Sequence, residues 1–323
     1  TCTVAALLGS SNHLVAGPTN ASCMVIFTLI APLVAQRGGD PLEIVLLLTF
    51  ITGAIQLTFG LLKLGGLVRY VSNSVVVGFT AGAGILIAAN QLRNILGIDL
   101  PAEQTGRFHE AVAATAVHLR DTNPYALTVG ALTAALVVLV PRIHRRLPGS
   151  LIAVMVTGTL AWALGWHTPD AGAWRISIVR DIEPIHANLL HIFRLPELLV
   201  PPDLPLAREL GTGALALAIL GLIEASASAR AVAASSGQRL DFSRLFAGQG
   251  AGNLVGPFFS CFVGSGSFTR TAVCYQSGGR TRMAAVFSAL WTALVVLILA
   301  PVANFIPKAA PVSYTHLRAH ETR

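Results

Sequence analysis

Long apolar stretches separated by short polar ones make up most of the chain. The longest runs without Asp, Glu, Lys or Arg cover residues 1–36, 44–62, 71–92, 125–140, 147–166, 245–269 and 283–306. A helix needs about 20 mostly apolar residues to cross the hydrocarbon layer of a bilayer. Several runs reach this length, while others are short, broken or joined. The pattern therefore predicts roughly nine membrane segments in one polytopic, all-α domain.

Composition agrees with a membrane protein, because 54% of the residues are hydrophobic and 11% are charged, against about 25% charged in soluble domains. The net charge of +7 does not indicate a nucleic-acid partner, since the basic residues are spread over several loops. Basic loops with little acid alternate with acidic loops. The basic loops hold Lys63 and Arg69, then Arg142, Arg145 and Arg146, then Arg239 and Arg244, and finally Arg280 and Arg282. The positive-inside rule places such loops in the cytoplasm, so we expect a multi-pass integral protein of a bacterial plasma (inner) membrane, surrounded by lipid.

Motifs of soluble enzymes are missing from the sequence. It contains neither a phosphate-binding Gly-x-x-x-x-Gly-Lys-Ser/Thr loop nor a Gly-x-Ser-x-Gly elbow. Gly248, Gly250 and Gly252 superficially suggest a dinucleotide loop, but their spacing is typical of closely packed membrane helices, as is that of Gly78 and Gly82. The four cysteines lack Cys-x-x-Cys spacing, and no histidine pair has helical metal-ligand spacing. We therefore predict no enzyme, no cofactor and no metal site, with the thiols acting as small buried apolar groups.

A polar break interrupts the first apolar run at Gly17-Pro18-Thr19-Asn20-Ala21-Ser22. Proline is common in the first turn of a helix, and hydroxyl and amide side chains can accept from the free amides there. We predict that a helix begins at this break and runs on through residue 36, within the membrane. Its free N–H groups and the positive end of its dipole favour a bound anion. An ordinary loop end at the membrane surface is the alternative from this segment alone.

A second break has the same chemistry. Glycine and hydroxyl residues from Gly264 to Thr271 lead into a short helical stretch through Tyr275, and Arg270 adds a fixed positive charge. Many secondary transporters with inverted repeats bind their substrate between two such half-helix ends. The candidate anion-site residues are Thr19, Asn20, Ala21, Ser22, Ser267, Phe268, Thr269 and Arg270.

Glu224 is the only charged residue between Leu210 and Ala229, in a stretch long enough to cross the bilayer. An isolated ionised carboxylate is costly there, so it should be protonated, paired, or shared with a bound cation. Ser228 lies four residues further on, on the same helical face. We predict that Glu224, with Ser228 as an extra ligand, holds a coupling ion. A structural ion pair with Arg230 or Arg270 is the alternative.

Short motifs also occur in a fixed order along residues 1–311. They are Gly9-Ser10-Ser11 and Gly17-Pro18-Thr19, Gly65-Gly66-Leu67-Val68 with Val71-Ser72, Gly78-Phe79-Thr80-Ala81-Gly82 with Gln91-Leu92 and Leu96-Gly97, Gly221-Leu222-Ile223-Glu224-Ala225-Ser226 with Ala229-Arg230, Gly250-Ala251-Gly252-Asn253-Leu254, and Gly266-Ser267-Phe268-Thr269-Arg270-Thr271-Ala272-Val273. As an ordered set they resemble the SulP family of anion permeases, often called sulfate permeases.

The resemblance implies fourteen membrane segments in two inverted halves of seven, divided into a core and a gate domain. The anion would sit between the starts of segments three and ten, which correspond here to residues 19–22 and 267–270. On that registration residues 1–311 run from the end of segment two to the start of segment twelve, an incomplete membrane domain. In many members a cytoplasmic STAS domain follows it. Asn20 departs from the family, whose members more often carry a small apolar residue at this position.

Residues 312–323 abandon membrane composition abruptly. This segment resembles a translated cloning or sequencing adaptor, and we predict a non-native tail. A genuine polar loop is the alternative.

The predicted function is secondary active transport of a small anion such as sulfate or bicarbonate, or a dicarboxylate, coupled to a proton or a sodium ion. The family often forms homodimers, which the resemblance implies for the full-length protein. Three alternatives stay open: an uncoupled anion channel, a nucleobase-type permease of the same fold, and a non-transporting membrane scaffold or sensor.

Overall fold

The computed structural model describes residues 1–37, 40–66, 78, 82, 92–98, 108–143, 149–168, 172, 174–178, 181, 204–303 and 306–307. The chain divides into two compact units. The first comprises residues 1–78 and 188–294, and the second residues 79–187 and 295–323. All of the candidate site residues belong to the first unit. The predicted tail at residues 312–323 lies outside the described residues, as do Arg69, Arg145 and Arg146.

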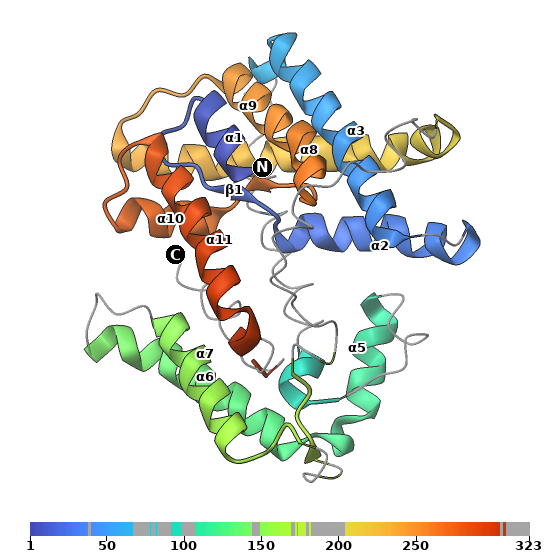
Figure 1. Ribbon diagram of the computed structural model, residues 1–323, viewed down its shortest axis with the longest axis vertical. Helices are drawn as coiled ribbons and strands as arrows, with labels where there is room; N and C mark the ends of the chain where they lie inside the picture. The colour runs from blue at the N-terminus through green and yellow to red at the C-terminus, as the bar shows by residue number, and fades with distance from the viewer. Residues whose placement is uncertain are drawn as a thin grey trace. The chain divides into compact units, whose positions relative to one another are not determined.

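The first unit is built from helices joined by one very small sheet (Figure 1). Its elements in chain order are α1 (Cys2–Leu8), β1 (Ala16–Gly17), α2 (Asn20–Arg37), α3 (Pro41–Leu61), α8 (Leu204–Ser236), α9 (Phe242–Val255), the 3-10 helix η8 (Gly256–Phe259), β2 (Ser265–Gly266), α10 (Phe268–Gln276) and the first part of α11 (Arg282–Ala303). Local capping explains two of the helix starts. The Asp40 carboxylate accepts from Leu42 N at 2.9 Å at the start of α3, and the Asp241 carboxylate accepts from Arg244 N at 3.1 Å at the start of α9.

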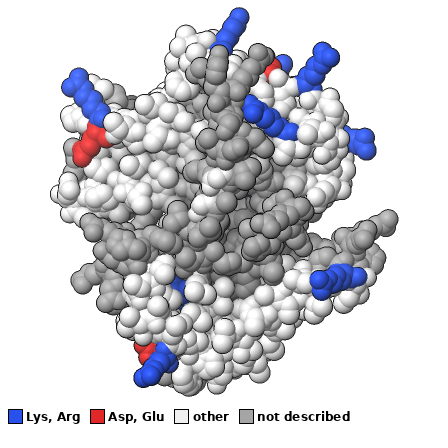
Figure 2. All heavy atoms as spheres, turned by 180° about the vertical axis from the view of Figure 1, so that it is seen from behind, with Lys and Arg blue, Asp and Glu red and all other residues white. Residues whose placement is uncertain are grey.

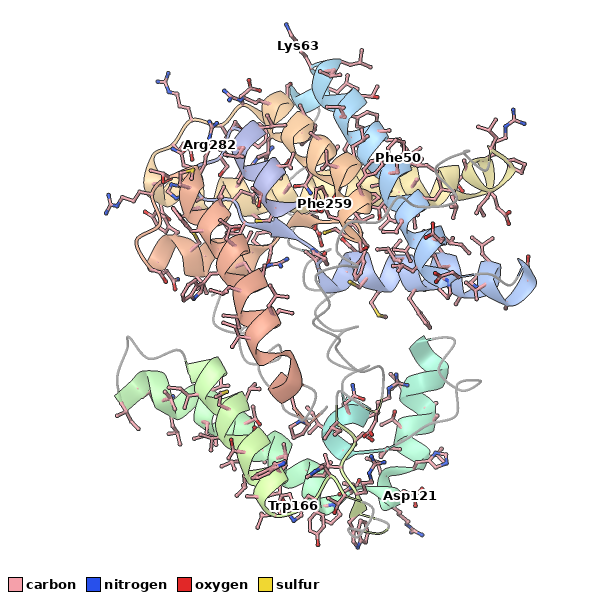
Figure 3. The ribbon with its side chains drawn as sticks, viewed as in Figure 1. Phe50, Lys63, Asp121, Trp166, Phe259 and Arg282 are labelled. Atoms are coloured by element: carbon pink, nitrogen blue, oxygen red, sulfur yellow. The ribbon has the colours of Figure 1, made fainter. Side chains whose placement is uncertain are left out.

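The second unit contains α5 (Phe108–Val117), the 3-10 helix η3 (Leu119–Asp121), α6 (Pro124–Ile143) and α7 (Gly149–Ala163). Helices α6 and α7 pack together, and the hydroxyl of Thr133 donates to that of Thr157 at 3.2 Å between them. Near one end of this pair, Tyr125 stacks on Trp166 with ring centroids 4.6 Å apart (Figure 3).

Glycines allow three helices of the first unit to approach closely. A Cβ added at Gly53 of α3 would lie 2.5 Å from Leu254 N of α9. Cβ atoms at Gly248 and Gly252 of α9 would lie 2.5 Å from Gly9 N, just after α1, and 2.8 Å from Thr1 O. The small-residue packing predicted around Gly248 is therefore confirmed. It is not seen at Gly78 and Gly82, where a Cβ would meet no described atom within 4 Å.

Helix α8 lies at the centre of the first unit because its apolar residues repeat at helical spacing. Leu206, Leu210 and Leu217 are buried against Ile44 and Leu48 of α3, in a cluster that also includes residues of α2. Further along α8, a second buried cluster of Leu222 and Ala225 with Leu14 and Leu245 joins it to α9 and to the segment after α1. Leu222 and Ala225 of the second cluster flank Glu224 along α8, so this packing holds the carboxylate in position.

Two described helices, α3 and α8, are long and apolar enough to cross a bilayer, and shorter apolar stretches occur within α2, α6, α7 and α11. Large apolar side chains such as Phe27 and Trp291 are exposed on the outer surface of these helices. On the face drawn in Figure 2, the described charged side chains occur singly or in small groups, with areas of other described residues between them. This distribution suits a surface that faces lipid.

The basic loops of the first unit gather at one end of it. The Arg244 Nε and Arg282 Nη1 groups donate to the last carbonyls around α1, Leu8 O at 3.2 Å and Leu7 O at 3.5 Å. Just beyond Lys63, which extends away from the end of α3 (Figure 3), Gly65 N donates to the Ser243 hydroxyl at 3.2 Å. This clustering is what the positive-inside pattern predicts for loops on one side of a membrane.

Candidate functional site

Strand pairing brings the two predicted breaks together. Strands β1 and β2 are antiparallel, with Ala16 opposite Gly266 and Gly17 opposite Ser265. Helices α2 and α10 therefore start from neighbouring points at the middle of the unit (Figure 1). Strand β2 also rests on α8, because a Cβ at Gly266 would lie 2.5 Å from Ala225 Cα. The sequence predicted both interrupted helices, and the structure shows that their starts converge beside the helix that carries Glu224.

The first tip, residues 17–22, is capped by Thr19. Its Oγ1 accepts from Ser22 N at 3.3 Å and lies 2.8 Å from Ser22 Oγ, while its carbonyl accepts from Cys23 N at 2.9 Å. Ser22 is buried and Ala21 is half-buried. The Asn20 side chain lies outside the described side chains, so its predicted contribution stays a prediction. Local hydroxyl capping thus explains why the helix begins here.

The second tip, residues 267–270, is capped by Ser267, whose Oγ accepts from Arg270 N at 3.4 Å and lies 3.4 Å from Thr269 Oγ1. Phe268 is half-buried, whereas Thr269 and Arg270 are exposed. The Arg270 Nη2 group donates to Pro18 O at 2.7 Å. A cation of the second tip therefore reaches the residue that precedes the cap of the first tip.

Glu224 receives hydrogen bonds from both sides of the strand pair. Its side chain is buried, with 9% of the residue surface exposed. Its Oε2 accepts from Thr19 Oγ1 at 3.0 Å and from the Ser265 hydroxyl, and Ser265 Oγ lies 3.3 Å from Thr19 Oγ1. Hydroxyls can turn their lone pairs to a cation as readily as their protons to a carboxylate. Three elements thus direct oxygen ligands to one point.

The alternative of a structural ion pair is not what the described residues show. Arg270 donates to Pro18 O, and the guanidinium carbon of Arg230 lies over the Phe242 ring at 5.0 Å from its centroid. The described partners of Glu224 are hydroxyl groups. The carboxylate is thus bonded to neutral donors.

Ser228 binds β2 and not Glu224. Its Oγ donates to Gly266 O at 3.1 Å and it is fully buried. That Ser228 ligates a coupling ion stays a prediction, and the contact that the structure shows connects α8 to β2.

Ser265 is the residue that sequence reasoning left out of the site. It lies in the same glycine and serine stretch as Ser267, two residues before the cap, and the alternation of a strand turns it toward Glu224. The sequence signal that could have identified Ser265 was the need of a buried carboxylate for hydrogen-bond donors.

Metal-binding clusters do not occur in the described part of the chain, where no group of three or more His, Cys, Asp or Glu residues is suitably placed. The four cysteines are free thiols and half-buried, whereas the sequence predicted small buried apolar groups. Cys2, Cys23 and Cys274 lie in α1, α2 and α10, and Cys261 follows the 3-10 helix η8.

Comparison with known protein families shows which family the chain belongs to. The family model described as the sulfate permease family matches residues 1–313 of the chain. The chain belongs to this family. The prediction made from the ordered motifs is confirmed, and membership of a permease family agrees with the expectation that the chain is not an enzyme.

Relatives and solved structures extend the match over nearly the whole chain. "Putative sulfate transporter YvdB" of Bacillus subtilis (strain 168) is 30% identical over 304 residues, covering 94% of this chain and 54% of the relative. "Sulfate transporter 2.1" of Arabidopsis thaliana is 29% identical over 315 residues, covering 94% of this chain and 45% of the relative. The chain thus spans about half the length of the curated relatives that it matches.

The fold is that of solved transmembrane domains. The transmembrane domain of a cyanobacterium bicarbonate transporter, BicA, matches with a TM-score of 0.80 and 26% identity, over 99% of this chain and 77% of that one. Murine Solute Carrier 26 family member A9 in the inward-facing state matches with a TM-score of 0.80 and 20% identity, over 98% of this chain and 54% of that one. The predicted all-α, polytopic, inverted-repeat membrane fold is confirmed. Within the described residues, the two-residue strands β1 and β2 form one small sheet.

Proposed function

We propose that the chain forms the membrane part of a secondary active transporter for a small anion, sulfate or bicarbonate in the first place, in a bacterial inner membrane. The observation that carries the proposal is the junction of two half-helix starts beside a buried carboxylate. Relatives named as sulfate transporters and a structural neighbour named as a bicarbonate transporter support an oxyanion as the cargo.

The anion site would lie at the two tips. The first backbone amides of α2 and α10 have no acceptor within their own helix, and the positive ends of both helix dipoles point to the same region. Thr269 and Arg270 are exposed at the second tip, so a hydroxyl and a guanidinium are available to an oxyanion. The Thr19 hydroxyl is already directed to Glu224, and we assign its contribution to the coupling side of the site.

The coupling ion would bind at Glu224. A proton would convert the carboxylate to a neutral acid, and a sodium ion would be held by Glu224 together with the hydroxyls of Thr19 and Ser265. Either ion cancels one negative charge next to the anion. Because the neutralised carboxylate repels the anion less, binding of the ion favours binding of the anion and the reverse, which is the linkage that a symporter needs.

The transport step follows from the fold. In inverted-repeat transporters one domain moves largely as a rigid body against the other, and the site opens alternately to each side of the membrane. The short strands and the Arg270 contact to Pro18 hold both tips together during such a movement. We further propose that the full-length protein is a homodimer.

Transport by the full-length protein in liposomes tests the proposal. Labelled sulfate and labelled bicarbonate are offered separately, with and without an inward sodium or proton gradient, and with uracil as a competitor. We expect accumulation of one oxyanion that requires one of the gradients and is insensitive to uracil. Anion currents that depend on neither gradient would identify an uncoupled channel. Competition by uracil would identify a nucleobase permease, and the absence of accumulation would identify a scaffold.

A further inference from the structure

Three side-chain amides, Gln56, Gln249 and Asn253, are almost completely buried behind strand β2, with 0%, 1% and 0% of their surfaces exposed. None belongs to the candidate site. They come from α3 and from two successive turns of α9, in a unit whose other buried residues are mostly apolar. Burying an amide is costly unless it is hydrogen-bonded. The hydrogen-bond partners of these three side chains therefore show which part of the structure they keep in place.

Asn253 clamps the residue just before β2 through both of its polar atoms. Its Nδ2 donates to Gly264 O at 2.9 Å, and Gly264 N donates to its Oδ1 at 2.9 Å. This reciprocal pair fixes the two peptide groups on either side of the Gly264 Cα in position and orientation. Ser265, which donates to Glu224, is the next residue along the chain.

Gln249 and Gln56 add further hydrogen bonds to the contact between Asn253 and Gly264. Gln249, one turn before Asn253 on α9, also donates through Nε2 to Gly264 O. The Gln56 Oε1 accepts from Asn253 Nδ2 at 2.8 Å, and its Nε2 donates to Ala218 O of α8 at 3.3 Å. The network therefore connects α3, α8 and α9 to a single carbonyl at the edge of the site.

We propose that Asn253, supported by Gln249 and Gln56, is a positioning residue that holds β2 at the height where Ser265 reaches Glu224, and so sets the affinity for the coupling ion. The inference rests on the proposed function. Apolar packing is not directional, whereas hydrogen bonds at both the N–H and the C=O of Gly264 allow one placement of the strand. Because Ser265 follows directly, a displacement of Gly264 carries its hydroxyl away from Oε2 of Glu224.

The first test measures coupling-ion dependence in the full-length protein. Uptake of labelled sulfate or bicarbonate is followed against sodium or proton concentration for Asn253→Ala and for the milder Gln56→Leu. We expect Asn253→Ala to raise the half-saturating ion concentration by about tenfold or more, the usual size of effect for residues that support ion ligands. Gln56→Leu should shift it in the same direction by less, because the two bonds from Asn253 to Gly264 remain.

Thr52→Val is the matched control. Thr52 is as buried as Gln56 and lies one turn earlier on α3, but its hydroxyl donates within the helix to Leu48 O at 2.8 Å. It should leave the half-saturating concentration unchanged. A purely structural role for Asn253 would lower the maximal rate or the amount of inserted protein at an unaltered half-saturating concentration, and that result would overturn the inference.

Amide hydrogen exchange gives an answer that does not depend on transport. In purified full-length protein, Asn253→Ala should speed exchange in a peptide covering residues 263–267 while the body of α9 keeps its protection. Unchanged exchange there would overturn the positioning role even if Asn253→Ala transports poorly. If the wild-type protein shows no ion-dependent uptake, the proposed function fails, and the exchange result still decides whether these amides hold β2.

Discussion

The two helix tips begin with similar residues but make different contacts. At the first tip, the Thr19 hydroxyl caps α2 and donates to Glu224. At the second tip, the Ser267 hydroxyl caps α10 and its other contact is Thr269, while Arg270 reaches back to Pro18. The carboxylate is thus bonded to the first tip and to the strand that precedes the second. The exposed donors and the cation belong to the second tip.

This division teaches that repeated chemistry does not imply repeated roles. Both tips offer free backbone amides to an anion, yet the hydroxyl of the first is oriented by the acid and those of the second are not. We infer that side chains of the first tip serve the coupling ion and side chains of the second serve the anion.

The largest expected effect comes from removing the acid. Glu224→Gln keeps the shape of the side chain but carries no charge, so it should abolish the sodium or proton dependence of oxyanion uptake in liposomes. Ser226→Ala is the control, because Ser226 is buried on the same helix and donates to Leu222 O at 2.6 Å. Uptake by Glu224→Gln that keeps its full ion dependence would remove Glu224 from the coupling site.

Removing the cation of the second tip should have the next largest effect. Hydrogen bonds to charged groups contribute about 1.5–3 kcal/mol, so Arg270→Ala should weaken oxyanion binding roughly ten- to hundredfold. Calorimetry on the purified full-length protein measures this directly. Arg270→Lys, which keeps the charge and loses the planar fork, should weaken binding less. Equal affinity in wild type and Arg270→Ala would exclude Arg270 from the anion site.

A pair of substitutions compares the two caps. Thr19→Val preserves shape and removes the donor to Glu224, so it should raise the half-saturating coupling-ion concentration about fivefold, the size expected for one hydrogen bond. Ser267→Ala should instead raise the half-saturating anion concentration, and the lost cap should cost about 1 kcal/mol of stability. Initial uptake rates against each ligand separate the two. If both variants shift both constants equally, the division of roles between the tips is wrong.

The smallest effect is expected at Ser228. If its hydroxyl only ties α8 to Gly266 O, Ser228→Ala loses about 1 kcal/mol of stability and shifts the ion and anion constants together by a small factor. Thermal unfolding, together with uptake measured against ion concentration, distinguishes a structural role of Ser228 from a role as an ion ligand. A selective loss of ion affinity would restore Ser228 as a ligand of the coupling ion.

The sequence was sufficient to predict both helix starts, because proline, glycine and hydroxyl residues within an apolar run have strong local preferences. It also identified Glu224, since a charge is conspicuous in such a stretch. The family resemblance supplied the expectation that the two starts meet.

The contacts between the tips could not be predicted from local patterns. The partner of Glu224 was open, because the sequence does not tell whether a buried acid faces Arg230, Arg270 or hydroxyls 41 and 205 positions away. Ser265 was overlooked because its role depends on the pairing register of two-residue strands. The buried amides were overlooked for the same reason, since Gln56 and Asn253 meet across 197 positions of chain.

Anion binding measured with and without the coupling ion tests the central claim most directly. Calorimetric titration of the purified full-length protein with sulfate or bicarbonate is performed in saturating sodium, in its absence, and at two pH values, for wild type and Glu224→Gln. The account predicts that one coupling ion raises the anion affinity of the wild type by about fivefold or more, and that this gain disappears in Glu224→Gln. An anion affinity of the wild type that is the same under all of these conditions would contradict the claim that both ligands meet at the junction of the two tips.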